Sequence, residues 1–319
     1  MITIARIDHV ALRVADLDEA AARWGRQFGL HERDRDAGTV RLACDDEPYC
    51  LELIAGGEPG LDHVGWELAA DCPLEQAAEH LRTHGASIEP AGTGPSGTSL
   101  RTTDPDGNGV EILAFREPAS RLTPHARPPS AAPAGHPRRL GHVNFLTGAI
   151  TAQLAFYTEV LGMRITDWLG DGGVWLYVNS DHHVMALIQK PSPPAPHFHH
   201  LALELVDIGQ MRMALDHLGR HGRWLGWGPV RHGVGGNIAA YVRIVEEACF
   251  VELYCDMEQL PAGHTPRRWP DDRYSSNTWG PLPPRSYFRF DAAAIASERE
   301  SLEMLGVPLP PAPEPTAVR

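Results

Sequence analysis

The chain has 319 residues, 43% of them hydrophobic and 22% charged, and a formal net charge of −13 at pH 7. This composition is that of a soluble globular protein large enough for two domains. The acidic balance argues against a nucleic-acid partner, since phosphate binding requires a basic face, and the sequence has no run of about 18 apolar residues that would favour a membrane.

The N-terminal segment follows a strand pattern rather than that of a secretion signal. Charges at Arg6, Asp8 and Arg13 interrupt any apolar region of the signal-peptide type. The five cysteines form no Cys-x-x-Cys motif, and we interpret them as small buried side chains in a reduced compartment. We therefore expect a cytoplasmic protein.

An internal repeat begins with a strand-like segment that contains a histidine. Residues 6–10 carry His9 and residues 139–143 carry His142, and in both cases a Gly-hydrophobic pair follows twenty residues after the histidine. Between them, apolar side chains recur every three to four residues, which predicts an amphipathic helix in each unit.

A second pair of segments repeats in the same way. Residues 61–68 contain His63 and residues 198–205 contain His200, and each leads into a helix pattern that ends in His-Leu-x-x-His-Gly. Short β-rich runs complete the units. The sequence therefore predicts four units of one helix plus several strands, grouped two and two.

The organisation along the chain follows from these units. Residues 1–118 and 139–256 are the two predicted domains. Residues 119–138 contain five prolines and are interpreted as the interdomain linker. Residues 257–319 are expected to form a C-terminal arm with one helix near 292–305.

Two imidazoles and one carboxylate fall at equivalent strand positions in the second half. His142 and His200 lie on the first strands of their units, and Glu252 lies on a last strand. This donor set holds a divalent metal and leaves coordination positions open. A single buried histidine is more often an ordinary core residue, but all three fall in register with the repeat. The same register in the first half selects three further residues: His9, His63 and Glu111.

The two halves differ around these sets. Alignment of the repeats places Tyr49 in the first half where the second half has His183. Residues 90–103 contain no counterpart of His232. Because only the second half has groups for acid/base chemistry, we place catalysis there. We expect the first-half set to be a vestigial metal site, with a genuine second metal site as the alternative.

The paired units resemble the vicinal oxygen chelate superfamily, and the second half is similar to the type I extradiol (catechol 2,3-cleaving) dioxygenases. The resemblance implies an α+β fold of four βαβββ modules, paired into two domains. Each domain would be a cupped mixed sheet with its helices outside. The segments that carry the resemblance are Gly141–Phe145, Asp181–Leu187, His199–Leu203 and Arg231–Glu252.

The resemblance also implies roles for individual residues. The second-half metal would be Fe(II), with Mn(II) as the alternative, and O₂ would be the co-substrate. Relatives commonly form homotetramers, so a homo-oligomer is expected. The implied residues are His142, His200 and Glu252 as metal ligands, His183 as acid/base, His232 and Tyr241 beside the substrate oxygens, and Asn144 and Trp175 in the substrate pocket.

Three local features bear on the site. The turn Val245–Cys249 departs from the family, so the hairpin between Tyr241 and Glu252 is where we expect a difference. Trp227 stands where relatives that accept carboxylated catechols have an arginine, which argues against an acidic substrate. With Trp175 and Trp279 it is a candidate for an apolar pocket wall. Spacing favours His183 over the neighbouring histidine as the inward-facing residue.

The function implied is an Fe(II)-dependent extradiol dioxygenase. It would open a small aromatic diol of the catechol type with O₂, giving a hydroxymuconic-semialdehyde-type product. One alternative is a metal-dependent isomerase or lyase of the same superfamily, which acts without O₂ and requires more protein ligands. Another is a non-catalytic binder of small molecules, although such relatives have typically lost the metal ligands.

Overall fold

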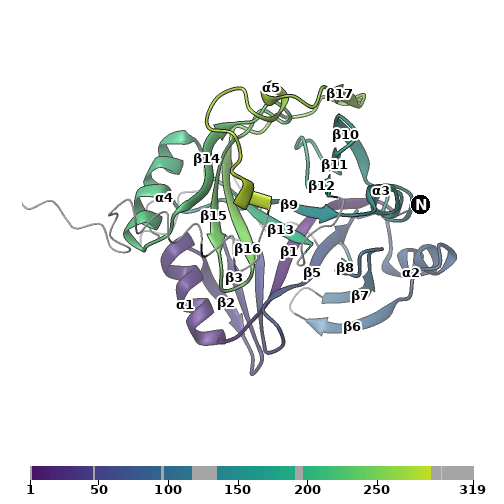
Figure 1. Cartoon of the computed structure of the whole chain (residues 1–319). Helices are drawn as coiled ribbons and strands as arrows, with labels where there is room; N and C mark the ends of the chain where they lie inside the picture. The colour runs from purple at the N-terminus through teal and green to yellow at the C-terminus, as the bar shows by residue number, and fades with distance from the viewer. Residues whose placement is uncertain are drawn as a thin grey trace, which may run out of the picture.

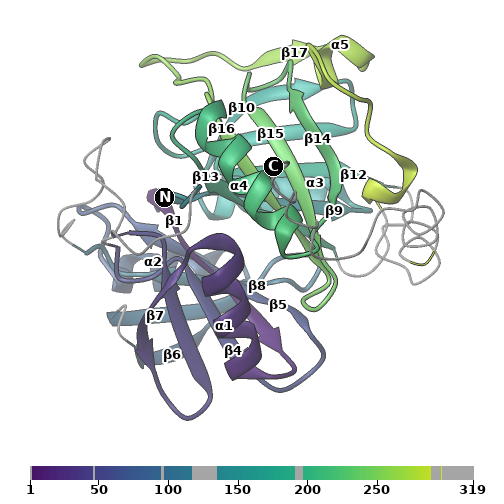
Figure 2. The same cartoon turned by 90° about the vertical axis from the view of Figure 1, so that its left-hand side faces the viewer.

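The computed structural model describes residues 2–45, 47–94, 97–116, 135–190 and 197–288, together with residue 296. Most of the expected linker and of the expected helix near 292–305 lies outside the described residues. The chain forms two halves, each built on one mixed sheet, which Figure 2 shows one above the other. Among the described residues, none of the helices combines the length and apolar character needed to cross a membrane.

The first half is one eight-stranded sheet with the strand order β2-β3-β4-β1-β5-β8-β7-β6. Strand β1 runs parallel to β4, β5 runs parallel to β8, and the two first strands β1 and β5 join the units antiparallel. Its elements are β1 (Ile4–Val14), α1 (Leu17–Phe28), β2 (His31–Arg35), β3 (Thr39–Ala43), β4 (Leu51–Ala55), β5 (Gly60–Leu68), α2 (Leu74–Thr83), β6 (Glu89–Gly94), β7 (Gly97–Thr103) and β8 (Gly109–Leu113).

The second half repeats this arrangement in a nine-stranded sheet of order β14-β15-β16-β13-β9-β12-β11-β10-β17. The predicted four βαβββ modules, paired into two domains, are thereby confirmed. The elements are β9 (Arg139–Thr147), α3 (Ile150–Ala155), a π-helical turn (Phe156–Val160), β10 (Arg164–Leu169), β11 (Gly173–Tyr177), β12 (Met185–Gln189), β13 (Phe198–Glu204), α4 (Ile208–Arg220), β14 (Leu225–Arg231), β15 (Ile238–Ile244), β16 (Cys249–Cys255), β17 (Arg267–Trp269), α5 (Arg273–Ser276) and a 3₁₀ turn (Arg285–Phe288).

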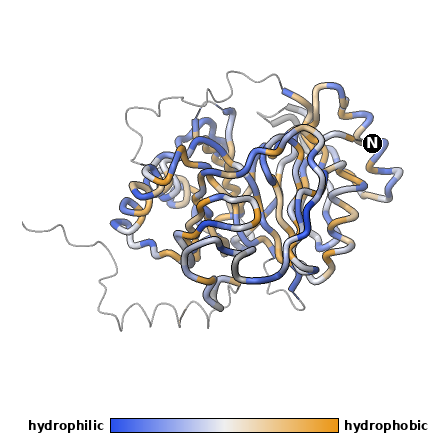
Figure 3. Tube along the Cα trace, turned by 90° about the horizontal axis from the view of Figure 1, so that it is seen from above, coloured by the Kyte–Doolittle hydropathy of each residue, from blue (hydrophilic) through white to orange (hydrophobic). Residues whose placement is uncertain are grey.

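The outer helices begin and end where local chemistry dictates. The Asp16 carboxylate accepts a hydrogen bond from the Glu19 amide at the start of α1, and Gly29 ends it with a left-handed φ of 72°. Asp207 caps α4 in the same way. Hydrophobic and hydrophilic residues alternate along the chain (Figure 3), as expected where each element has one face in the core.

The halves contact each other through α1 and α4, which lie side by side (Figures 1 and 2). Arg23 of α1 binds Glu247 in the turn between β15 and β16, with Nη1 3.0 Å from Oε2, and both side chains are buried. This turn is the departure noted in the sequence. The hairpin itself is regular, because β15 and β16 pair without a register shift and place Tyr241 directly opposite Glu252.

Residues 257–288 are part of the second half. Strand β17 pairs parallel with β10 at the edge of the sheet. The chain then passes α5 and returns to contact β14 through the 3₁₀ turn, as the upper part of Figure 1 shows. Residues 257–288 of the arm therefore cover one side of the space enclosed by the second sheet.

Candidate functional site

Three neighbouring strands at the centre of the second sheet carry the predicted ligands. His142 on β9 and Glu252 on β16 both pair with Ala202 on β13, so the three residues form one row across the sheet. His200 lies two residues before Ala202 and therefore points to the same face. The small side chain of Ala202 leaves space between the two ligands that flank it.

The three ligand atoms have the geometry of a metal site. The Oε2 atom of Glu252 lies 3.0 Å from His142 Nε2 and 3.1 Å from His200 Nε2, and all three side chains are buried. A metal bound at about 2.1 Å with bond angles near 90° separates its ligands by about 3 Å. The two distances and the donor types therefore fit a divalent metal held on one face, with other positions open.

Neighbouring groups fix which atoms face this point. The His199 Nε2 donates to the Tyr287 carbonyl at 2.7 Å, so its Nδ1 has no hydrogen and accepts from His200 Nδ1 at 2.8 Å. This leaves the lone pair of His200 Nε2 toward the metal position. The Asn237 amide donates to Glu252 Oε1 at 2.9 Å and leaves Oε2 for the metal.

The charge states match those of ligands. Burial opposes ionisation of Glu252, but His142 and His200 hold the pKa of this carboxyl well below its usual range. Burial also lowers the pKa of His200. A carboxylate and neutral imidazoles are the forms that bind a metal ion.

A cavity of about 360 Å³ lies on the open side of this triad. Trp227 stacks on the Tyr241 ring with centroids 5.1 Å apart. Trp279 is 43% exposed, and the cavity lining among the described residues does not include it, so its assignment to the pocket wall is wrong. The lining includes the residues predicted for catalysis and substrate binding, which are His183, His232, Tyr241, Asn144, Trp175 and Trp227.

His183 reaches the cavity at the end of a chain of hydrogen bonds. Asp167 Oδ2 lies 3.0 Å from His182 Nε2, and His182 Nδ1 lies 3.0 Å from His183 Nδ1. Because a carboxylate accepts, His182 carries its hydrogen on Nε2, and its Nδ1 accepts from His183. The Nε2 of His183 is then a free acceptor. Burial keeps the pKa of His183 well below its usual value.

The C-terminal arm binds Asp167, the carboxylate at the start of this chain of hydrogen bonds. Arg267 Nη2 and Trp269 Nε1 both lie 2.8 Å from Asp167 Oδ2. Arg267 also binds Glu258 at 2.7 Å. These contacts keep Asp167 ionised: burial raises its pKa, but the hydrogen bonds from His182 and Arg267 lower it to about 2.

On the wall of the cavity opposite His183, His232 and Tyr241 form a hydrogen-bonded pair. His232 Nδ1 donates to the Ser276 carbonyl at 3.0 Å, and its Nε2 lies 2.8 Å from the Tyr241 hydroxyl. Burial lowers the pKa of His232 and raises that of Tyr241. The neutral His232 therefore accepts the phenolic hydrogen, and the Tyr241 oxygen can accept a hydrogen bond from a ligand.

Several residues of the site had no prediction from the sequence. Asn237, Asp167 and the arm residue Tyr287 act through contacts that span long stretches of chain. One signal was present, since His182-His183 and His199-His200 are both histidine doublets. In each doublet the second histidine faces the site and the first supports it through an Nδ1–Nδ1 contact.

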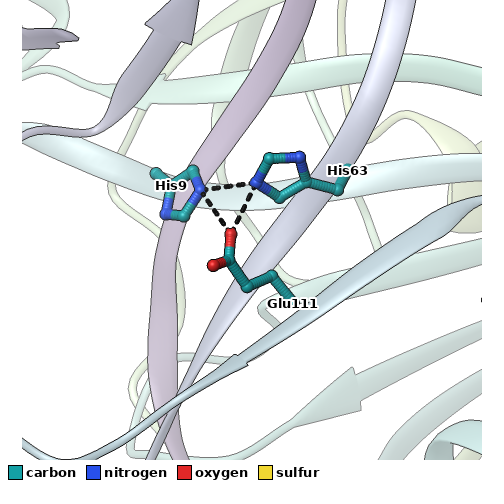
Figure 4. Close-up of side chains that lie close together, drawn as sticks. All are labelled: His9, His63 and Glu111. Atoms are coloured by element: carbon teal, nitrogen blue, oxygen red, sulfur yellow. Dashed lines mark hydrogen bonds and ion pairs between the residues drawn. The ribbon is translucent and has the colours of Figure 1, made fainter. Parts of the chain in front are cut away.

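The equivalent set in the first half is assembled as well. His9 Nε2 and His63 Nε2 lie 2.9 Å apart, and Glu111 Oε2 lies 2.7 Å from His63 Nε2 and 3.5 Å from His9 Nε2 (Figure 4). Burial raises the pKa of Glu111, but hydrogen bonds with the two histidines bring it well below its usual range.

Comparison with known proteins agrees with this architecture. Residues 6–112 and 139–248 match the family described as the Glyoxalase/Bleomycin resistance protein/Dioxygenase superfamily. Metapyrocatechase 2 of Cupriavidus necator is 27% identical over 89% of this chain and 91% of its own length. An iron-dependent extradiol dioxygenase of Rhodococcus jostii is 29% identical over 64% of this chain and 74% of its own length.

The fold is also similar to solved structures. A Mn(II)-bound glyoxalase from Novosphingobium aromaticivorans superposes with a TM-score of 0.77 and 23% identity, covering 89% of this chain and 94% of that protein. At this identity the likeness concerns the fold.

Proposed function

Because the chain belongs to the Glyoxalase/Bleomycin resistance protein/Dioxygenase superfamily, we propose that its second half is an Fe(II)-dependent extradiol dioxygenase, with Mn(II) as the alternative metal. The substrate is a small aromatic diol of the catechol type. Ring opening beside the diol incorporates both atoms of O₂ and gives a hydroxymuconic-semialdehyde-type product. The names of the relatives from Cupriavidus and Rhodococcus support this activity.

One observation carries the proposal: the open face of the triad of His142, His200 and Glu252 borders a cavity with an acid/base group on its wall. A bound Fe(II) would supply chelation of both diol oxygens and an adjacent position for O₂. The cavity holds the ring against the triad, and its apolar walls at Trp175 and Trp227 exclude water.

The protein's own part in the reaction is to move and orient protons. The Nε2 of His183 accepts a proton from a diol hydroxyl and returns it later, as a neutral imidazole can. A general acid/base group of this kind typically contributes about 10²–10⁴-fold to the rate. Tyr241, whose hydroxyl is held by His232, orients a substrate oxygen from the other wall.

The structure of the pocket favours this chemistry over the isomerase alternative. Ala186 lines the cavity beside the triad, at the strand position where the first half has Glu52. A methyl group cannot ligate, so this side of the metal position stays available to a chelating substrate. An isomerase that works without O₂ would require more protein ligands, and it has no need for the wall formed by His183, His232 and Tyr241.

The test is turnover of a catechol panel. Anaerobically purified protein loaded with Fe(II) should turn catechol or an alkylcatechol yellow and consume O₂ in equimolar amount with the diol. His200→Ala is the control that lacks the metal site of the second half. If the whole panel gives no yellow colour and no O₂ uptake, the proposal is contradicted. The cytoplasmic location, the homo-oligomer and the domain boundaries stay predictions, and light scattering of the purified protein checks the oligomer.

A further inference from the structure

We propose that the first half contains a second, closed metal site formed by His9, His63, Glu111 and Glu52. The ligand is a divalent transition-metal ion, which ties together β1, β4, β5 and β8. This site is independent of the proposed ring cleavage and would be structural, because protein groups surround the metal position.

The histidine tautomers place two ring nitrogens that can bind a cation face to face. His9 Nδ1 lies 2.8 Å from Asp8 Oδ2, and His63 Nδ1 lies 2.8 Å from Asp62 Oδ1. Because carboxylates only accept, both Nδ1 atoms carry the hydrogen. The two Nε2 lone pairs then face each other at 2.9 Å, with the Glu111 carboxylate beside them (Figure 4). Lone pairs and a carboxylate at this distance repel unless a metal ion or a proton lies between them, and the donor set is one that a metal ion prefers.

The support around these ligands is that of a metal site. A histidine bound to a metal typically donates its other ring nitrogen to a carboxylate, as His9 and His63 both do. The supporting carboxylates are held in turn, since Arg116 contacts Asp8 and Arg13 lies 2.8 Å from Asp62. The Ser99 hydroxyl donates to Glu111 Oε1, so Oε2 faces the two imidazoles.

A fourth potential ligand, the carboxylate of Glu52, lies beside the triad. Glu52 pairs with Ala11 on β1, two residues after His9, and its Oε2 lies 3.9 Å from His63 Nε2. Its other oxygen is held by Arg41 Nε at 2.8 Å. Four protein ligands close a site, whereas three leave a position for substrate. A small movement of Glu52 toward the ion completes the set.

Arg101 is the competing cation and must be accounted for. Its Nη2 lies 3.1 Å from His63 Nε2 and 3.3 Å from Glu111 Oε2, and its side chain is 37% exposed. Within the part of the chain that the structure describes, it makes no hydrogen bond to His9. The guanidinium therefore covers the outer side of the set and leaves the contact between the two Nε2 atoms without a cation.

The experiment counts metal ions in the full chain. The His200→Ala variant lacks the catalytic set, so after chelator treatment it should bind one equivalent of Co²⁺, measured by mass spectrometry of the metal, with a higher melting temperature. Adding His63→Ala or Glu111→Gln should remove that equivalent. Two such variants guard against misfolding of either one, and circular dichroism checks the fold. Glu52→Gln should weaken binding about 10–100-fold.

Matched controls exclude other binding. His84→Ala removes an exposed histidine, and Cys50→Ser removes a potential ligand from the group of Cys44, Glu47 and Cys50, in which both cysteines are buried. Both should leave one equivalent in the His200→Ala background. No Co²⁺ in that background would overturn the proposal. Binding that appears only after Arg101→Gln would also overturn it, since the guanidinium would then be the native cation.

Discussion

The two halves of the molecule place the same three types of ligand on equivalent strands, but the residues around these ligands differ. In each half a histidine, a small residue and a glutamate form one row, with Gly65 or Ala202 in the middle. A Cβ atom at Gly65 would lie 2.4 Å from the His9 ring, which explains the smaller residue there. The sheet core therefore determines where a metal can bind in both halves.

The two halves differ at three positions beside the ligands. Tyr49, Glu52 and Arg101 in the first half correspond in register to His183, Ala186 and Tyr241 in the second. In the first half these positions carry groups that fill or cover the space above the metal position. In the second half they provide an acid/base group, open space and a hydroxyl. The proposed reactivity therefore depends on the side chains around the metal position, whereas the proposed metal binding depends on the three strands that carry the ligands.

The largest expected effect comes from exchanging the acid/base position. His183→Phe should keep the metal but lower kcat about 10²–10⁴-fold, because the proton acceptor on the cavity wall is lost. Tyr49→Phe at the equivalent position of the first half should leave turnover unchanged. Steady-state O₂ uptake with metal content measured in parallel checks both variants. Normal turnover of the His183→Phe protein would remove that residue from the mechanism.

A smaller effect should follow from closing the second site in the manner of the first. Ala186→Glu places a carboxylate beside the triad and should lower kcat/KM roughly 10²–10³-fold, the loss typical of a disrupted contact at the reacting centre. It should also slow the loss of metal to a chelator. Ala186→Leu, of similar size but without a ligand atom, should not slow that loss. Full activity of Ala186→Glu would show that the space beside Ala186 is not used.

The smallest effect concerns Asp167, the carboxylate behind His183. Asp167 is linked to His183 through His182. In the first half, Asp8 and Asp62 bind the two ligand histidines directly. The pKa of Asp167 is lowered to about 2 in the folded chain, compared with about 4 when unfolded. Its contribution to the free energy of unfolding, up to about 2 kcal/mol, is therefore present above pH 4 and is lost as the pH falls toward 2.

Urea unfolding between pH 5 and pH 3 measures this contribution. The stability difference between the wild type and Asp167→Asn should shrink as the pH falls, because Asp167 is protonated from about pH 4 in the unfolded chain, whereas its pKa of about 2 keeps it ionised in the folded chain. A difference that stays constant across this range would contradict the assignment.

The internal repeat explains why the fold and the two ligand sets could be predicted. His142, His200 and Glu252 each have a counterpart in the first half because each lies on the first or last strand of a module, and strand periodicity then brings them to one face. The contacts that support the ligands and His183 leave no such repeat in the sequence. Asp167 meets Trp269 only because β10 pairs with β17, and His199 binds a backbone carbonyl at Tyr287. A carbonyl is present in every residue, so no residue type marks that partner.

The central claim is that both halves hold a metal and only the second reacts. The most direct measurement is metal content and O₂ uptake, with a catechol, in the Fe(II)-loaded His63→Ala and His200→Ala proteins. Each variant should retain one metal equivalent, His63→Ala should keep its O₂ uptake, and His200→Ala should lose it. Loss of turnover in a folded His63→Ala protein, together with retained turnover in His200→Ala, would contradict this claim.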